Sequence, residues 1–174
     1  MGNIFFTADP HYSHRNIIRM SRRPFDDVDD MNQTMIRNHN SVVSNDDDVF
    51  IIGDFMWSSK VAETNDLLGK LRGRKHLIVG NHDRKPVCAA SGWASTSSYK
   101  EISIDNRKVV LFHYPILEWN GYWHNGLHVH GHVHGNMKPY HERALNAGVD
   151  VNGFIPVTLQ TLIQNTKARM TSPG

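Results

Sequence analysis

Five short segments of this sequence carry side chains that could hold a metal ion, and each comes at the end of a stretch typical of a β-strand. Their side chains are carboxylates, imidazoles and one amide, in Asp9-Pro10-His11, Gly53-Asp54, Gly80-Asn81-His82-Asp83, His113 and Gly131-His132-Val133-His134. Such oxygen and nitrogen donors suit divalent ions such as manganese, iron or zinc. Side chains two residues apart in an extended segment face the same side, so Asp9 with His11, and His132 with His134, can converge. The pattern predicts a metal site built from several parts of the chain.

Each segment taken alone also has an ordinary structural explanation. Gly-Asp and Gly-Asn pairs after a strand are common in turns, and a lone His113 is more often a hydrogen-bonded core residue. The histidines that alternate from His128 to His134 could form one polar strand face. The metal interpretation is favoured because all five segments occur together at expected strand ends. Two registers are open for the last segment, and we prefer His132 with His134 over His128 with His130 because Gly131 precedes the later pair.

The elements that must position these side chains follow from the apolar pattern. Short apolar runs predict strands at residues 3–7, 49–52, 76–79, 99–104, 107–112, 127–131 and 144–151. Helical spacing predicts helices at residues 27–43, 58–71 and 156–166. Strands alternate with helices at first and then follow one another, so we expect an α/β fold with mixed sheets. Ligands of such folds gather at the carboxyl ends of strands, which is where the five segments lie.

Length and composition limit the class of protein. A chain of 174 residues is expected to form a single domain, residues 1–174. No apolar run approaches the roughly 20 residues of a membrane span, so no membrane partner is expected. The first residues lack the features of a signal peptide and Cys88 is the single cysteine, which together favour a cytoplasmic location. A net charge of +2 is too small to predict strong nucleic-acid binding, and the sequence predicts no particular oligomeric state.

The order Asp-x-His, Gly-Asp, Gly-Asn-His-Asp, His, Gly-His-x-His resembles the calcineurin-like metallophosphoesterase family. The motifs span residues 9 to 134, and the stretches His14 to Ile18 and Gly148 to Asn152 are similar to small single-domain members from bacteria and bacteriophages. The resemblance implies a four-layer α/β/β/α sandwich of two mixed sheets, with a dinuclear metal site at the carboxyl ends of strands.

The resemblance also implies a ligand set. The first metal would be held by Asp9, His11 and His134, the second by Asn81, His113 and His132, and Asp54 would bridge the two. The two divalent ions are expected to be manganese, with iron, zinc or nickel as alternatives. The chain departs from the family pattern at Phe55-Met56-Trp57, where many relatives have a further Asp and some an Arg, and at Phe112, where a Gly is frequent. Neither departure removes a ligand, and both argue against the protein-phosphatase branch.

The implied mechanism is hydrolysis of a phosphate ester. Two cations roughly 3.5–4 Å apart can hold a phosphoryl oxygen and bring a bridging water to the hydroxide form near neutral pH. That hydroxide would attack phosphorus in line, and His82 would assist the leaving group. Asp83 would orient the ring of His82, or alternatively cap the helix that follows it.

The substrate is expected to be a phosphorylated small molecule or a nucleotide. Arg15, Arg23, Arg84 and Tyr114 are candidate substrate contacts because they lie near the motif segments in the chain. The aromatic residues Trp119, Tyr122 and Trp123 could stack on a nucleobase with Tyr114, or equally cap the core. A chain of this size has little room for a cap domain, which favours phosphodiesters. The alternative is a phosphomonoesterase or pyrophosphatase with the same metals. A nuclease is disfavoured by the small net charge. A non-catalytic scaffold is disfavoured because every ligand position and His82 are present.

Overall fold

The strands of the protein form two mixed sheets, as predicted. The computed structural model describes residues 2–172. In this range the first sheet has the spatial order β4-β3-β2-β1-β9 and consists of β1 (Ile4–Thr7), β2 (Asp48–Ile52), β3 (Arg74–Ile78), β4 (Ser95–Ser97) and β9 (Val157–Thr158). β1 to β4 are parallel, and β9 is antiparallel to β1. The second sheet has the order β5-β6-β7-β8 and consists of β5 (Tyr99–Ile104), β6 (Arg107–Phe112), β7 (Leu127–His130) and β8 (Ala144–Asn146), with only β5 antiparallel to its neighbour.

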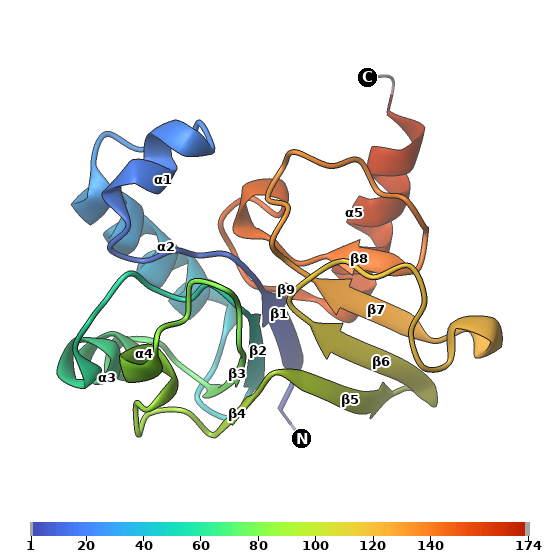
Figure 1. Cartoon of the computed structure of the whole chain (residues 1–174), viewed down its shortest axis with the longest axis horizontal. Coiled ribbons are helices and arrows are strands. Elements are labelled where there is room, and N and C mark those ends of the chain that lie inside the picture. Colours follow the sequence, from blue (N-terminus) through green and yellow to red (C-terminus); the bar gives the residue numbers. More distant parts are fainter. Residues whose placement is uncertain (1, 173–174) are drawn as a thin grey trace.

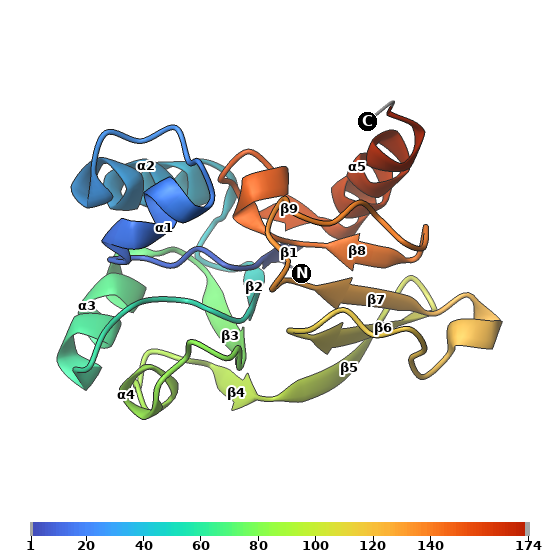
Figure 2. The same cartoon turned by 45° about the horizontal axis from the view of Figure 1, so that its top comes forward.

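Helices lie outside the first sheet and at the edge where the two sheets meet. They are α1 (Arg15–Met20), α2 (Val28–Val42), α3 (Val61–Lys70), α4 (Lys85–Cys88) and α5 (Leu159–Thr171), with the short 3-10 helices η1 (Tyr122–His124) and η2 (Val149–Val151). Figures 1 and 2 show α1 to α4 on one side of the molecule and α5 on the other, beside β8 and β9. Within residues 2–172, no helix combines the length and the apolar character needed to cross a membrane.

The alternation of side chains along the first sheet creates its two apolar faces. In β2, Val49 and Ile51 pack with Met31 and Met35 of α2 in one core cluster. Phe50 and Ile52 face the other way, toward the apolar residues of the second sheet. Successive side chains of a strand point to opposite faces, so a continuous apolar run fits a strand that is buried on both sides. The predicted fold class, with two mixed sheets packed together and helices outside them, is confirmed.

The helix predicted at residues 27–43 forms where its sequence indicates. Asp27 is the N-cap, and its carboxylate accepts hydrogen bonds from the backbone N–H groups of Asp29 and Asp30, both at 2.9 Å. Such a cap satisfies donors that the first helical turn leaves without partners. Met31 and Met35 lie one turn apart and are buried against the first sheet. α2 thereby covers the sheet directly below the loop that follows β1.

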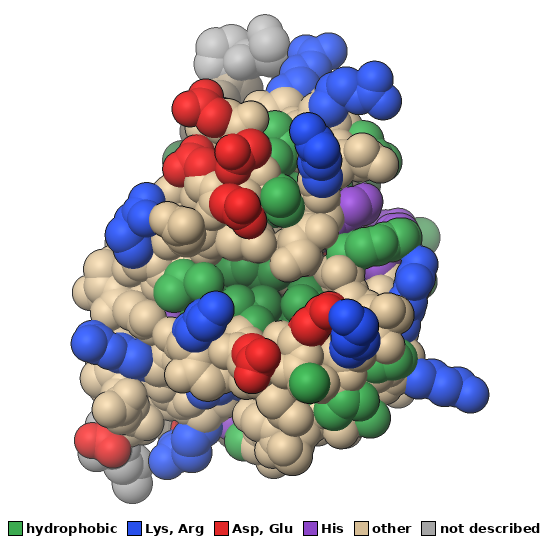
Figure 3. All heavy atoms as spheres, turned by 90° about the vertical axis from the view of Figure 1, so that its left-hand side faces the viewer, with side chains coloured by type: hydrophobic (Ala, Val, Ile, Leu, Met, Phe, Trp, Pro, Cys, Tyr) green, Lys and Arg blue, Asp and Glu red, His purple; other side chains and the backbone are tan. Residues whose placement is uncertain are grey.

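The space between α2 and α3 forms a shallow groove on the surface. Figure 3 views the molecule from the side of α1, α2 and α3 and shows apolar side chains in the middle of this face. The groove is lined by Ile36, Met56 and Leu67 and bordered by Asp29 and Asp66, among others. Met56 immediately precedes Trp57, so this groove ends next to the loop that follows β2.

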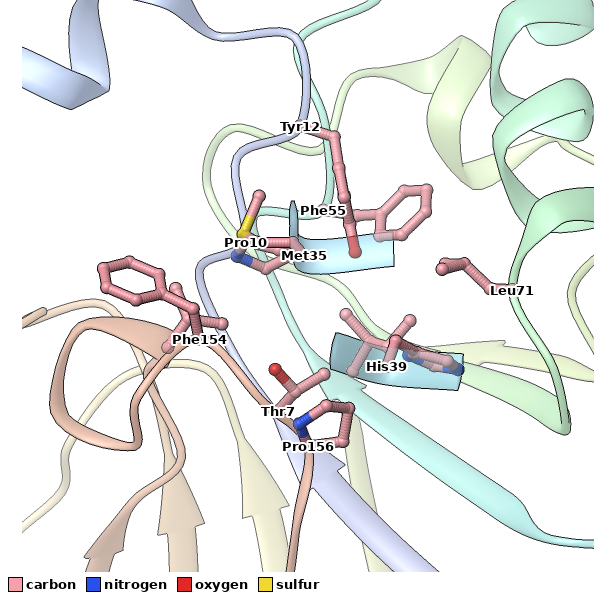
Figure 4. A pocket seen from close by; sticks show the side chains of 11 residues that line it. Thr7, Pro10, Tyr12, Met35, His39, Phe55, Leu71, Phe154 and Pro156 are labelled. Carbon is pink, nitrogen blue, oxygen red and sulfur yellow. The ribbon is translucent and has the colours of Figure 1, made fainter. Parts of the chain in front are cut away.

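A small internal cavity of about 10 Å³ lies between α2, β2 and the loop after β1 (Figure 4). Pro10 and Tyr12 line it from above, and Met35 and His39 of α2 are among the residues that close it. A cavity of this size holds about one water molecule. Pro10 and Tyr12, the residues on either side of His11, therefore share this small cavity with side chains of α2.

Two histidines of β7, His128 and His130, are buried, and their rings lie within hydrogen-bond distance of backbone carbonyl groups. The ring of His128 lies between two backbone carbonyl oxygens, 3.3 Å from that of Val110 and 3.1 Å from that of Tyr114. Trp119 packs over the ring, with centroids 5.5 Å apart. The aromatic segment around Trp119 therefore covers the outer face of the second sheet, which agrees with the core-capping alternative for this residue.

Burial of His128 predicts a loss of stability in mild acid. Burial lowers the pKa of His128 to about 4, from an ordinary value near 6.5. Above pH 6.5 the ring is neutral in both states; between pH 6.5 and 4 the unfolded chain takes up the proton and the folded protein does not. The free energy of unfolding should therefore fall in this window, by about 2 kcal/mol from His128 between pH 7 and pH 5.

Urea unfolding at pH 7 and pH 5 measures this effect. The variant His128→Gln keeps a polar side chain that can donate to one of the two carbonyl groups. It should lose about 2 kcal/mol less than the unmodified protein between the two pH values. An equal loss in both proteins would contradict the prediction.

Several element bounds differ from those predicted. The strand predicted at 144–151 ends at Asn146, because the side chain of Asn146 accepts a hydrogen bond from the backbone N–H of Gly148 and turns the chain into η2. The helix predicted at 156–166 is preceded by β9 and begins at Leu159, with Thr158 as its cap. α1, α4 and β4 were not predicted, because segments of three to six residues carry too little periodicity to detect.

Candidate metal centre

The loops that carry the predicted ligands are held together by backbone hydrogen bonds. The N–H of Asp9 donates to the carbonyl of Gly53 (3.1 Å) and that of Gly131 to the carbonyl of His113 (2.9 Å). The N–H of Ala8 donates to the carbonyl of Ala147, the residue after β8 (2.8 Å), which joins the two sheets. The carboxyl ends of β1, β2, β6 and β7 therefore meet in one place, as the strand-end pattern predicted.

Most of the predicted ligands have a left-handed backbone. The φ angles are 54° for Asp9, 50° for His11, 55° for Asp54, 69° for His132 and 48° for His134. The prediction that Asp9 and His11, and His132 and His134, converge as alternate residues of extended segments is therefore wrong in its geometry. Side chains other than glycine rarely adopt this conformation, and it costs about 1–3 kcal/mol per residue. Strain of this kind persists where the surrounding structure holds side chains in set positions.

Gly53 and Gly80 allow two of these loops to approach each other closely. Gly53 has a φ of 83°, and a Cβ at this position would collide with the ring of His113. A Cβ on Gly80 would collide with the carboxylate of Asp54. Only glycine fits where backbone and ligand side chains are packed in this way.

Six of the seven predicted ligands form two groups, each with its donor atoms within 4.8 Å of one another. The first group is Asp9, His11 and His134; the second is Asp54, His113 and His132. The seventh, Asn81, places its Oδ1 3.0 Å from Nε2 of His113 and 3.0 Å from Nδ1 of His132. The structure thus brings all seven side chains together. Histidines 128 and 130 lie outside both groups, which agrees with the later of the two registers.

Asp54 lies between the two groups. Its Oδ2 is 3.5 Å from Nε2 of His11 and 3.4 Å from Nε2 of His113. Its Oδ1 accepts a hydrogen bond from the backbone N–H of His82 (2.8 Å). One carboxylate oxygen therefore faces ligands of both groups, which is the position expected of a shared ligand.

The charges of Asp54 and His113 depend on each other. Burial would raise the pKa of Asp54, but the hydrogen bond and charge of His113 hold it at about 2. Burial opposes a charge on His113, and the nearby carboxylate of Asp54 nonetheless raises the pKa of that imidazole. Nδ1 of His113 lies 2.9 Å from the carbonyl of Ile52, so the proton on Nδ1 has an acceptor and Nε2 faces the site.

The first group contains buried polar atoms that have no hydrogen-bond partner within the described residues. These atoms are Oδ2 of Asp9 and Nε2 of His11. Burial raises the pKa of Asp9 to about 6 and lowers that of His11 to about 3. An unsatisfied buried polar atom costs about 1–3 kcal/mol, so an oxygen and an imidazole nitrogen aimed at one point need a common partner. A divalent cation fits this donor set, because it accepts electron pairs from both.

Arg23 and Asp150 form a buried ion pair behind the first group. Nε and Nη2 of Arg23 lie 2.9 Å and 3.0 Å from the two carboxylate oxygens of Asp150. The same guanidinium donates to the carbonyl of Pro10 at 2.8 Å and that of Asp9 at 2.7 Å. Asp150 also faces Nδ1 of His134 at 2.7 Å, which orients the ring.

This arrangement corrects the expectation that Arg23 contacts substrate. The side chain of Arg23 is 0% exposed, and all of its described partners belong to the protein interior. Asp150 was not predicted as a site residue. It lies within the stretch from Gly148 to Asn152, which in the sequence is notable only for its similarity to small members of the family. Nothing in the sequence indicates what this carboxylate does.

His82 is exposed at the rim of the site, and none of the hydrogen bonds of the Asp83 carboxylate within residues 2–172 goes to its ring. The centroid of the His82 ring is 5.4 Å from that of His11. The Asp83 carboxylate accepts hydrogen bonds from the backbone N–H groups of Asp54 (2.9 Å), Phe55 (2.8 Å) and Gly80 (2.8 Å). Asp83 was expected to orient the ring of His82. Its carboxylate instead connects the loops after β2 and β3 through these hydrogen bonds. Nor does Asp83 cap α4, whose N-cap is Arg84.

The remaining candidate substrate contacts are Tyr114, Arg84 and Arg15. Tyr114 stands beside the second group, with its ring centroid 4.6 Å from that of His132. Arg84 lies over the ring of Trp57, at 4.3 Å from its centroid. Arg15 is exposed at the start of α1. Trp57 was noted in the sequence only as a departure from the family pattern.

Comparisons with known proteins find relatives that match over most of this chain and most of their own length. No protein-family model matches it. The chain is 30% identical over 171 residues to the uncharacterized protein MJ1445 of Methanocaldococcus jannaschii. This match covers 94% of this chain and 91% of the relative. The chain is also 27% identical over 185 residues to the gene 66 protein of Mycobacterium phage L5, covering 88% of this chain and 89% of that one.

A solved structure has a similar fold. The crystal structure of AQ665, a protein of unknown function from Aquifex aeolicus, matches with a TM-score of 0.76 and 25% identity. The match covers 94% of this chain and 99% of that one. On the extent and identity of the match to MJ1445, the chain belongs to the same family as that protein of Methanocaldococcus jannaschii.

Proposed function

We propose that this protein is a phosphoesterase that depends on two divalent metal ions and acts on phosphodiesters. One observation carries the proposal: two groups of ligand atoms share Asp54, and the buried Oδ2 of Asp9 and Nε2 of His11 have no hydrogen-bond partner within residues 2–172. A purely structural histidine cluster would satisfy its buried atoms within the protein.

We assign the ligands to the two metals as the resemblance implies. Asp9, His11 and His134 would hold one ion, with Asn81, His113 and His132 holding the other and Asp54 shared between them. The mixture of carboxylate, imidazole and amide oxygen favours manganese, with iron, zinc or nickel as alternatives. When bound, such a pair of ions neutralises phosphate charge and lowers the pKa of water toward neutrality.

His82 is the residue of this chain that would serve the leaving group. The bond from its backbone N–H to Asp54 anchors its loop beside the shared carboxylate, while its side chain is exposed to an incoming substrate. A neutral leaving alcohol requires a proton, and an imidazolium at this rim would donate it to the ester oxygen. Arg23 and Asp150 hold His134 and the carbonyl groups of the loop after β1 in place.

Exposure around the site supports a phosphodiester over a smaller monoester. Asp9, His11, Asp54 and His113 are buried at the floor, whereas Asn81, His82 and His132 are exposed at the rim. A floor of buried ligands under an open rim admits a phosphate with substituents on both sides. An enclosing pocket would select a terminal phosphate by size.

Metal reconstitution followed by an ester assay tests this proposal. Protein stripped of metal and then loaded with Mn²⁺ should bind about two ions per chain, by elemental analysis, and hydrolyse bis(p-nitrophenyl) phosphate faster than p-nitrophenyl phosphate. Faster cleavage of p-nitrophenyl phosphate would favour a monoesterase. If neither ester is cleaved in the presence of any of the four metals, the proposed function is wrong.

Substitution of His82 separates chemistry from metal binding. With a dinucleotide substrate, whose leaving alcohol needs a proton, His82→Gln should lower kcat by about 10²–10⁴-fold, the usual contribution of a positioned acid, with metal content unchanged. The matched control is His124→Gln, which changes an exposed histidine on η1. Full activity of His82→Gln would remove this residue from the mechanism.

A further inference from the structure

A row of neighbouring flat groups, His14, Trp57 and Arg84, leads from the metal ligand His11 to the surface. The ring of His14 lies 5.3 Å from that of His11, and it stacks on Trp57 at 4.7 Å with an angle of 14° between the planes. The guanidinium carbon of Arg84 then lies 4.3 Å from the centroid of the Trp57 ring. Three separate loops, those after β1, β2 and β3, contribute to this row.

The backbone holds the members of the row in place. The N–H of Tyr12 donates to the carbonyl of Phe55 (3.0 Å), and the N–H of Trp57 donates to the carbonyl of Tyr12 (2.8 Å). Asp83, next to Arg84, is bound to the loop of Trp57 through the N–H groups of Asp54 and Phe55. The contact between Trp57 and Arg84 therefore joins two loops that are already fixed to each other.

The guanidinium of Arg84 is available to an anion. Arg84 is exposed, and within residues 2–172 it forms neither an ion pair nor a side-chain hydrogen bond with the protein. A guanidinium whose carbon lies over an aromatic ring can still direct N–H groups at two oxygens of a phosphate. Trp57 is 40% exposed and limits the positions that the arginine side chain can take. Holding the arginine in advance lowers the entropy cost of binding.

The row stands on the side of the site where the leaving group would depart. The ring centroid of His82 lies 5.4 Å from that of His11, 6.4 Å from that of His14 and 6.1 Å from that of Trp57. His82 thus lies beside two members of the row, His14 and Trp57. A group attached to the ester oxygen that His82 protonates would extend past Trp57 toward Arg84.

We propose that Arg84, held on Trp57, binds a second phosphate carried by the leaving group. The preferred substrates would then be nucleotide phosphodiesters that bear a further phosphate, such as a dinucleotide with a terminal phosphate. This inference rests on the proposed function and adds a substrate class to it. In this scheme Arg84 contacts the substrate, and Trp57 is a positioning residue that acts through Arg84.

Kinetics with matched dinucleotides test the inference. The substrates are thymidylyl-thymidine and the same dinucleotide carrying a phosphate on its 5′ or its 3′ end, assayed with Mn²⁺-loaded protein. At least one phosphorylated form should be preferred by about tenfold or more in kcat/KM, as expected for hydrogen bonds between charged groups. The preference should appear mainly in KM, because the second phosphate is remote from the reacting atom.

Variants at the row should remove the preference. In Arg84→Gln and in Trp57→Leu the ratio of kcat/KM with and without the extra phosphate should fall toward one, whereas Arg84→Lys should retain part of it. Arg19→Gln, a change of an exposed arginine on α1, should leave the ratio as it is. Competitive inhibition by thymidine 3′,5′-bisphosphate relative to thymidine 5′-monophosphate should change in parallel.

The outcomes separate this inference from the proposed function. Cleavage of bis(p-nitrophenyl) phosphate without a preference for the phosphorylated dinucleotides would overturn the inference alone. An unchanged preference in Arg84→Gln would do the same, since another residue would then bind the phosphate. Failure to cleave any ester would overturn the proposed function itself.

Discussion

Replacing Asp54 with alanine is expected to remove metal binding and hydrolysis together. Its Oδ2 is within 3.5 Å of both His11 and His113, so a single substitution takes a donor from each group. The change also deprives the backbone N–H of His82 of its acceptor. Loss of a partner that only orients a ligand already weakens metal binding by about 10–100-fold, so loss of a shared ligand should exceed that range.

Titration with Mn²⁺ by calorimetry and elemental analysis measure this effect directly. Asp66→Ala, which removes an exposed carboxylate from α3, is the control for the general effect of a lost negative charge. Asp54→Ala with full metal content would show that the two groups do not share this ligand, and it would overturn the dinuclear arrangement. Circular dichroism in the absence of metal checks that the variant folds.

Breaking the pair between Arg23 and Asp150 is expected to produce the largest loss of stability. Both side chains are almost fully buried, at 0% and 7% exposure, so Arg23→Gln leaves the carboxylate of Asp150 without its charged partner. Removal of one partner of a buried ion pair costs about 3–5 kcal/mol. The carbonyl groups of Asp9 and Pro10 lose their donor in the same variant.

An exposed pair of the same chemistry provides the control. Arg74 contacts both carboxylate oxygens of Asp48, at 2.9 Å and 2.6 Å, but the arginine side chain is 58% exposed. Arg74→Gln should therefore cost no more than about 1 kcal/mol. Urea unfolding of both variants compares the two sites. A loss below about 1 kcal/mol for Arg23→Gln would contradict the role assigned to burial.

Asp150→Asn changes the carboxylate of the same ion pair and tests whether it positions His134. The variant keeps an oxygen near His134 but removes the charge that fixes the proton of that ring on Nδ1. Its affinity for Mn²⁺ should fall by about 10–100-fold even where the protein remains folded. Unchanged affinity would show that Asp150 stabilises the fold without positioning His134.

The sequence by itself determined the residues that could serve as ligands and the strands that carry them. Apolar runs such as 49–52 report burial on both faces of a sheet, and they predicted most strands within a few residues. The spacing of Met31 and Met35 and the acids at the start of the helix likewise predicted α2. These signals are local, because backbone geometry alone decides which side chains share a face.

Only the tertiary structure decided what the side chains around the ligands do. Arg23 and Asp150 are 127 positions apart, and neither residue type nor spacing shows that one neutralises the other in the interior. The carboxylate of Asp83 accepts hydrogen bonds from three backbone N–H groups and does not orient His82. Arg84 contacts Trp57, which belongs to a different loop. The left-handed backbone of Asp9 and His11 likewise depends on contacts between distant segments. Packing between distant segments supplies the energy that such conformations and buried charges require, and sequence periodicity carries no record of that packing.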